Sequence, residues 1–179
     1  MIKIRIGGWA GQGTVLSGQI LAKSLALDQG YEVIQTRSYS AAVRSGIAFS
    51  DIIADKDEVN ELIIDTPDYL ILLYQKTLDE WKDIVGKVDN LIVDSTRVAD
   101  VPDIDGNVFA VPAGEIADGI GTAKAANIVL LGALAAVTDV ISLEALKRTV
   151  QVQFPEKYVE LNLRAIGRGY DYINENLKI

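Results

Sequence analysis

Hydrophobic positions along the chain follow two periods, one typical of strands and one typical of helices. Residues 2–7 alternate and predict a strand, whereas residues 14–29 carry apolar side chains at helical spacing. Continuous apolar runs at 69–74 and 90–94 are typical of strands that are covered on both faces. The repeated strand–helix order therefore predicts a mostly parallel sheet with helices on both faces. Further strands are predicted at 32–36, 47–54 and 107–111.

The last third of the chain is predicted to be helical. Residues 124–138 form an apolar helical stretch, Ser142 caps the start of another helix, and Pro155 begins the last one. Because 179 residues suit one domain, we expect a single three-layer α/β domain over residues 1–179 with a helical C-terminal third. Shorter helices are predicted at 77–85 and 112–119.

The amino-acid composition excludes several kinds of catalytic and metal site. The chain contains no cysteine, which excludes disulfides, thiolate zinc sites, a cysteine nucleophile and iron–sulfur clusters held by this chain. It contains no histidine, the commonest general base and metal ligand. A net charge of −8 and scattered basic residues argue against nucleic acid and anionic membranes as partners. We therefore expect a protein that binds or scaffolds, with no catalytic residue and no metal site of its own.

The start of the chain and one apolar stretch indicate where in the cell the protein is expected. No signal peptide precedes the first predicted strand, so we expect the chain to be cytoplasmic. Residues 125–141 approach the length of a membrane span but contain Asn127, Thr138 and Asp139. We therefore expect no membrane span, and a helix buried in the domain or at a subunit interface is the better interpretation.

A glycine-rich turn joins the first predicted strand to the first helix. Backbone N–H groups at such a helix start bind anions, most often phosphates. The spacing of Gly8, Gly11 and Gly13 is G-x-x-G-x-G, which is neither the dinucleotide fingerprint nor a Walker A loop. The alternative is that these glycines only allow the strand and the helix to pack closely.

Polar residues follow the second predicted strand. Ser38, Tyr39 and Arg44 offer hydroxyl groups and one fixed cation, which suit a phosphate or a carboxylate. If the sheet is doubly wound in the usual order, this loop and the glycine turn flank one crevice. The alternatives are that Tyr39 is a packed aromatic and that Arg44 pairs with an acid. We expect Asp94 to cap a turn and Asn127 to satisfy a neighbouring backbone group.

Four sequence blocks resemble the gamma subunits of 2-oxoacid:ferredoxin oxidoreductases. The turn at 8–13 is similar to the family opening G-x-G-G-Q-G, with Ala10 in place of a glycine. The loop at 38–46 resembles S-Y-G-P-E-x-R-G-G but lacks its proline, its glutamate and two of its glycines. The segment 125–134 is similar to A-x-N-M-x-x-L-G-A-L, and 154–169 looks like the last helix of the family. The blocks come in family order and span nearly the whole chain.

The resemblance implies a thiamine-diphosphate-dependent hetero-oligomer that oxidatively decarboxylates a 2-oxoacid. The acyl group would pass to coenzyme A and the electrons to ferredoxin or a similar acceptor. Thiamine diphosphate, Mg²⁺ and iron–sulfur clusters would be held by other subunits, because this chain has no G-D-G…N signature and no cysteine. Alpha and beta subunits are the implied partners, with a delta subunit as a further candidate. Among substrates 2-oxoglutarate is favoured, with pyruvate and branched-chain 2-oxoacids open.

The resemblance makes the chain a non-catalytic gamma subunit, inactive alone, that helps to bind coenzyme A. Because apolar side chains lie on every side of the helix at 125–136, we also expect an interface there, with a homodimer of the isolated chain as one outcome. The rival hypothesis is a stand-alone α/β module that binds a nucleotide or coenzyme A for regulation. The candidate cofactor-binding residues are Gly11, Gln12, Gly13, Ser38, Tyr39 and Arg44.

Overall fold

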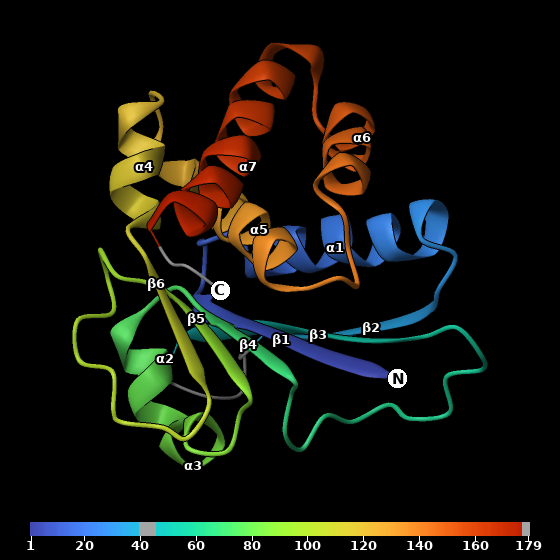
Figure 1. The fold of residues 1–179 in the computed structure, drawn as a ribbon, viewed down its shortest axis with the longest axis vertical. Coiled ribbons are helices and arrows are strands. Elements are labelled where there is room, and N and C mark those ends of the chain that lie inside the picture. Colours follow the sequence, from blue (N-terminus) through green and yellow to red (C-terminus); the bar gives the residue numbers. More distant parts are fainter. Residues whose placement is uncertain (40–45, 177–179) are drawn as a thin grey trace.

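The parallel half of the sheet carries the predicted strand–helix order. The computed structural model describes residues 1–39 and 46–176 (Figure 1). Strand β1 (Ile2–Trp9) pairs in parallel with β4 (Tyr69–Leu72), which is followed by β5 (Asn90–Asp94) and β6 (Asn107–Val111) in the same direction. The complete order is β2-β3-β1-β4-β5-β6.

The other half of the sheet is antiparallel. Strand β3 (Ile47–Asp55) lies between β1 and β2 (Glu32–Tyr39) and runs against both. Its register joins Trp9 of β1 to Ile47 and Tyr39 of β2 to Ala48. The pairing also extends β2 beyond the predicted end at residue 36, because β3 supplies main-chain partners for its polar last residues. The sheet is thus mostly parallel, as predicted, but β3 separates β2 from β1.

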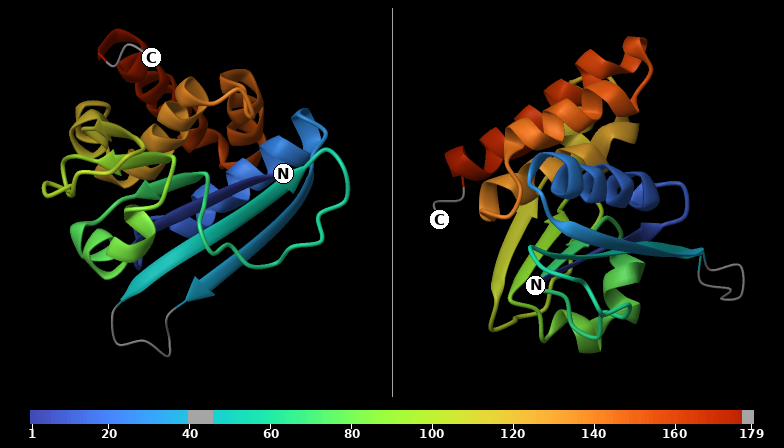
Figure 2. Two further views of the ribbon diagram at one scale, coloured as in Figure 1. Left: turned by 60° about the horizontal axis from the view of Figure 1, so that its bottom comes forward. Right: turned by 90° about the vertical axis from the view of Figure 1, so that its right-hand side faces the viewer.

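Helices cover both faces of the sheet. Helices α1 and α4 to α7 lie on one face, and α2 and α3 lie on the other (Figures 1 and 2). This arrangement confirms the predicted three-layer α/β fold with a helical C-terminal third. The helix bounds are α1 Thr14–Asp28, α2 Gln75–Glu80, α3 Lys82–Val85, α4 Ala113–Gly119, α5 Ala126–Val137, α6 Leu143–Gln153 and α7 Glu156–Asn176, with a 3-10 turn at Ala123–Ala125.

The central strands contribute side chains to two hydrophobic clusters, one on each face of the sheet. In β4, Leu70 and Leu72 join the cluster under α2 and α3, whereas Ile71 belongs to the larger cluster under the other helices. Successive side chains of a strand point to opposite faces, so a continuous apolar run is what such a strand needs. The helix predicted at 77–85 is interrupted at Trp81, whose ring packs edge-to-face on Phe49 at 5.7 Å between centroids.

Helix α5 is covered by the chain itself, which fits a helix buried in the domain and corrects the expectation that its apolar sides need an interface to cover them. Every residue from Ala126 to Ala135 is buried. The cover comes mainly from α7, which crosses α5 in backbone contact. A Cβ atom added at Gly132 would lie 1.9 Å from the Ile166 carbonyl oxygen, and one at Gly169 would lie 1.9 Å from that of Val129. The apolar surface of α5 therefore gives no support to a homodimer.

Charged pairs fasten the edge of the sheet at which β1 begins. The N-terminal ammonium of Met1 lies 2.6 Å from Asp55 and lowers the pKa of that carboxyl. The Glu61 carboxylate accepts a hydrogen bond from Lys3 and raises the pKa of the ammonium. Within residues 1–39 and 46–176, none of the helices has the length and hydrophobicity that a bilayer crossing requires.

Candidate ligand-binding site

The carboxyl ends of the parallel strands meet at one edge of the sheet. Helix α1 leaves β1 over one face and α2 leaves β4 over the other, so the winding reverses between these strands. Ligands of open α/β sheets bind at such a switch point. A cavity of about 160 Å³ lies there; it is lined by Gly11, Gln12, Leu73, Asp94, Arg97, Ala123, Lys124 and Ala126.

The glycine turn needs its glycines for backbone geometry. Gly11 and Gly13 have φ angles of 91° and 78°, in the left-handed region that favours glycine. A Cβ atom at Gly13 would also lie 2.5 Å from Nδ2 of Asn127, so close packing accounts for this position. Gly11 has open space and lines the cavity. Helix α1 begins with no side-chain cap and no acid in its first turn, which leaves its positive end available to an anion.

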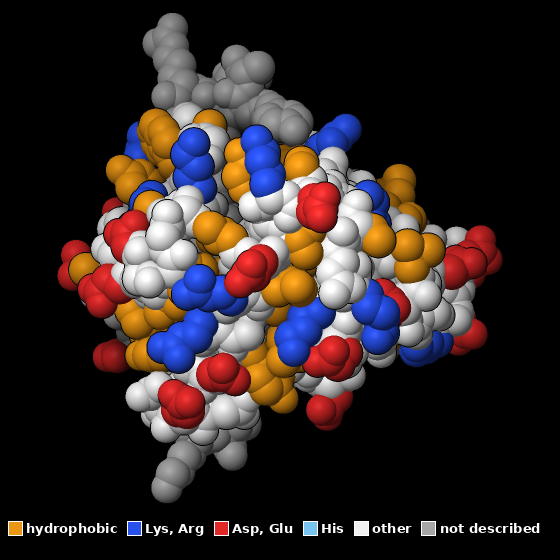
Figure 3. Space-filling view, turned by 90° about the horizontal axis from the view of Figure 1, so that it is seen from above, with side chains coloured by type: hydrophobic (Ala, Val, Ile, Leu, Met, Phe, Trp, Pro, Cys, Tyr) orange, Lys and Arg blue, Asp and Glu red, His pale blue; other side chains and the backbone are white. Residues whose placement is uncertain are grey.

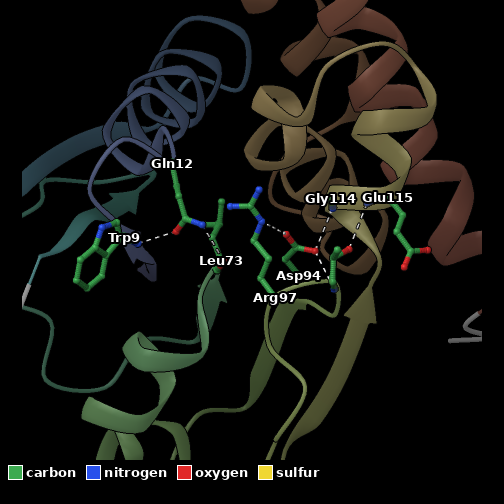
Figure 4. Close-up of polar contacts among 8 residues, drawn as sticks. Trp9, Gln12, Leu73, Asp94, Arg97, Gly114 and Glu115 are labelled. Carbon is green, nitrogen blue, oxygen red and sulfur yellow. Dashed lines mark hydrogen bonds and ion pairs between the residues drawn. The ribbon is translucent and has the colours of Figure 1, made fainter.

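Gln12 bridges the two strands of the switch point. Its Oε1 accepts a hydrogen bond from the Trp9 backbone N–H at 2.6 Å, and its Nε2 donates to the Leu73 carbonyl at 3.2 Å (Figure 4). The amide therefore joins the ends of β1 and β4 while it forms part of the cavity wall. Its first role in this structure is to shape the cavity.

Asn127 of helix α5 anchors the glycine turn. Its Nδ2 donates to the Gly13 carbonyl at 3.2 Å and to Ser17 Oγ at 2.9 Å. The side chain is buried in the apolar helix α5, where an amide without partners would be costly. The prediction that Asn127 satisfies a neighbouring backbone group is confirmed.

Asp94 caps the turn after β5, as predicted, and it does so with one oxygen. Oδ1 accepts hydrogen bonds from the backbone N–H groups of Thr96 and Gly114, each at 3.1 Å (Figure 4). Oδ2 is buried and receives no hydrogen bond from any residue that the structure describes. Arg97 Nε lies 3.9 Å from Oδ2, which is an ion pair but too long for a hydrogen bond.

Two cations complete the cavity, and the sequence did not point to them as ligands. Arg97 follows Asp94 in the β5 turn, and Lys124 lies in the 3-10 turn before α5. The position of Arg97 just beyond the end of β5 is a usable signal, because ligands of parallel sheets bind at such strand ends. Lys124 carries no such signal, because it lies with Ala123 and Ala126 in a segment that follows no strand end.

The residues predicted after β2 lie on the other side of β1. Ser38 and Tyr39 are the last residues of β2, and β3 separates them from the glycine turn. Arg44 lies outside the described residues. The expectation that the two loops flank one crevice assumed that β1 and β2 were neighbours, and β3 lies between them. Gly46, which follows the loop, accepts a hydrogen bond from the Ala10 N–H at 2.8 Å, so a shared crevice stays a prediction. The cavity opens toward β4 and β5.

A second, larger hollow lies on the helical side. It measures about 670 Å³ between α4 and α7, with Glu115 and Ile116 on one wall and Arg164, Arg168 and Tyr172 on the other. The helical face mixes acidic, basic and hydrophobic side chains without a dominant sign (Figure 3). Across the ranges 1–39 and 46–176, no group of three acidic side chains is arranged to hold a metal ion.

Comparison with known proteins shows the family. Residues 3–172 match the model of the pyruvate ferredoxin/flavodoxin oxidoreductase family. The chain belongs to this family. The 2-oxoglutarate synthase subunit KorC of Methanocaldococcus jannaschii is 32% identical over 97% of this chain and 94% of its own length. Other relatives, about as similar, are named as subunits of ketoisovalerate oxidoreductase and pyruvate synthase.

Solved structures of the family share the fold. The gamma subunit of a keto/oxoacid ferredoxin oxidoreductase from Geobacter sulfurreducens has a TM-score of 0.85 and 31% identity, over 96% of this chain and 97% of that one. The 2-oxoglutarate:ferredoxin oxidoreductase of Magnetococcus marinus, solved with 2-oxoglutarate, coenzyme A and succinyl-CoA bound, has a TM-score of 0.86 at 26% identity. It matches 99% of this chain but only 32% of its own, so the same unit occurs within a longer chain.

Proposed function

We propose that this chain is the non-catalytic gamma subunit of a cytoplasmic 2-oxoacid:ferredoxin oxidoreductase complex. The observation that carries the proposal is a family match over residues 3–172 in a chain without cysteine or histidine. Such a chain has no thiolate for an iron–sulfur cluster and no imidazole for acid–base chemistry. The complex would oxidise 2-oxoglutarate in preference to pyruvate or branched-chain 2-oxoacids, since the similar KorC chain is named for 2-oxoglutarate.

The remaining parts of the enzyme belong to partner subunits. Alpha and beta chains, and a delta chain where one exists, would hold thiamine diphosphate, Mg²⁺ and the iron–sulfur clusters. Thiamine diphosphate supplies the carbanion chemistry of decarboxylation when it is bound. This chain would contribute packing and one wall of the coenzyme A site. The acyl-CoA product would leave from that site.

The switch-point cavity is the proposed contact with coenzyme A. Gly11 and Gln12 form its wall, Gly13 sets the start of α1, and Arg97 and Lys124 supply positive charge. Support comes from the Magnetococcus marinus relative, which was solved with coenzyme A bound. Ser38, Tyr39 and Arg44 stay predicted contacts for a more distant part of the ligand, because β3 lies between β2 and the cavity.

The test is capture of the chain with its partners. A tagged copy expressed in the native source is purified at moderate salt, and the co-purifying chains are identified by mass spectrometry. We expect a cluster-binding chain and a thiamine-diphosphate-binding chain at fixed stoichiometry. The captured complex is then assayed for coenzyme A-dependent acceptor reduction with 2-oxoglutarate, pyruvate and 2-oxoisovalerate. A chain that is captured alone, at any salt concentration, would contradict the proposal.

A further inference from the structure

Asp94 gives the switch-point cavity a second chemical character besides positive charge. Its side chain is fully buried, and the Thr96 and Gly114 N–H groups hold Oδ1 in place. Oδ2 therefore has a fixed direction, and the residue as a whole lines the cavity. A buried carboxylate oxygen without a hydrogen-bond donor is rare in folded proteins and calls for a partner.

The partner of Oδ2 has to be a hydrogen-bond donor. An ionised carboxylate only accepts hydrogen bonds, and a phosphate dianion also only accepts them. A phosphate placed against Oδ2 would meet a like charge in a buried setting. The same cavity carries Arg97 and Lys124, whose charges suit a phosphate. The Asp94 acceptor and the two cations therefore suit a ligand that has a neutral hydrogen-bond donor at one end and an anionic group beside it.

We propose that Asp94 is a specificity-determining residue for a phosphorylated ligand. Its Oδ2 accepts a hydrogen bond from a hydroxyl or amide N–H group of that ligand, and the phosphate of the ligand lies against Arg97 and Lys124. The inference rests on the proposed function, because it concerns the same cavity. It deepens that function by stating which end of the ligand enters. A purely anionic molecule such as pyrophosphate can bind the two cations but has no donor for a hydrogen bond to the carboxylate.

Asp94→Asn tests the proposal with little disturbance of the fold. The Asn carbonyl oxygen replaces Oδ1 and keeps both backbone hydrogen bonds, while the amide nitrogen replaces Oδ2 with a donor. The hydrogen-bonding direction is thus reversed at one atom. Glu115→Gln is the matched control: it removes one negative charge from an exposed side chain at the start of α4, outside the cavity.

The experiment measures the affinity of the assembled complex for coenzyme A and for inorganic pyrophosphate by titration calorimetry. In Asp94→Asn we expect coenzyme A to bind about 10- to 100-fold more weakly, which is the cost of losing a hydrogen bond to a charged group. Pyrophosphate should bind at least as tightly as to the parent, because a negative charge has been removed from the cavity. In Glu115→Gln both affinities should stay within about twofold of the parent.

Each contrary result has a distinct meaning. Equal coenzyme A affinity in the parent and Asp94→Asn complexes overturns the role of Asp94 and leaves the proposed function standing. Loss of both probes in the same proportion, together with a lower melting temperature, shows a purely structural residue and also overturns it. A parent complex that assembles but binds no coenzyme A contradicts the coenzyme A site itself, and with it this inference.

Discussion

At the residue scale, two buried polar groups hold elements that are remote in sequence. Asn127 of α5 bonds the Gly13 carbonyl and Ser17, so it fixes the start of α1. Arg5 of β1 bonds Asp51 of β3 through Nε and Nη2, at 2.7 and 2.6 Å, and also donates to the Ile64 carbonyl at 2.9 Å. Both groups have their partners within the chain, so both are expected to act on stability more than on chemistry.

The first prediction concerns Asn127→Asp. The substitution replaces the donor Nδ2 with an acceptor that faces the Gly13 carbonyl in a buried site, and it loses the hydrogen bond that Nδ2 donates to Ser17. We expect a loss of about 2–4 kcal/mol in the free energy of unfolding. Chemical denaturation measures it, with Asn174→Asp as the control. Asn174 makes a similar hydrogen bond to Tyr170, but it is exposed on α7, so its change should stay within about 0.5 kcal/mol. Similar losses in the two variants would contradict the anchoring role of Asn127.

The second prediction concerns the buried ion pair. Arg5→Met leaves the Asp51 carboxylate buried without its cation and should cost about 3–5 kcal/mol of stability. The double variant Arg5→Met, Asp51→Leu removes both charges. It should be less destabilised than the sum of the two single variants by about 2 kcal/mol or more. A double-mutant cycle from denaturation curves gives this coupling, and additive single effects would show that the pair is not energetically linked.

At the element scale, the crossing of α5 and α7 explains how such an apolar helix is covered. Gly132 and Gly169 allow each backbone to touch a carbonyl of the other helix. The sequence shows clearly that α5 is apolar, but it does not show which element covers α5. The pattern of α7 indicates one apolar face and does not indicate that this face packs on α5. Apolar residues on every side of a helix indicate burial, and they do not say whether the same chain or a partner provides it.

The third prediction compares glycines within α7. Gly169→Ala pushes a methyl group into the Val129 carbonyl and should cost about 2–3 kcal/mol, because the helices have to separate. Gly167 precedes Gly169 in the same helix, and a Cβ atom there would meet no atom within 4 Å. Gly167→Ala should therefore stabilise the chain by about 0.5–1 kcal/mol through helix propensity. Thermal unfolding of the two variants measures the contrast. Equal melting temperatures would contradict the backbone contact.

The strand pattern shows how much of the fold the sequence determined and where it stopped. Apolar runs located β4 and β5 and their cover on both faces, because burial is a local property of each strand. The insertion of β3 between β1 and β2 was not predictable, because hydrophobicity does not encode the direction of pairing. Gly11 and Gln12 lie at the strand edge as expected, because they follow β1 closely in the chain, whereas Ser38 and Tyr39 end a strand that β3 separates from β1.

At the scale of the whole molecule, the fold offers a site but few reactive groups. The switch-point cavity joins a glycine turn, a buried carboxylate and two cations, which are groups that bind and orient a ligand. The full sequence has neither cysteine nor histidine. These groups support the proposal that partner subunits perform the chemistry and that this chain binds a phosphorylated cofactor.

The most direct test of that proposal is turnover by the chain alone and by the assembled complex. Each is assayed at the same concentration with 2-oxoglutarate, coenzyme A, thiamine diphosphate, Mg²⁺ and a redox dye. We predict dye reduction by the complex and none by the isolated chain, because the proposed function assigns thiamine diphosphate and the iron–sulfur clusters to partner subunits. Sustained dye reduction by the isolated chain, after every other protein has been removed, would contradict it.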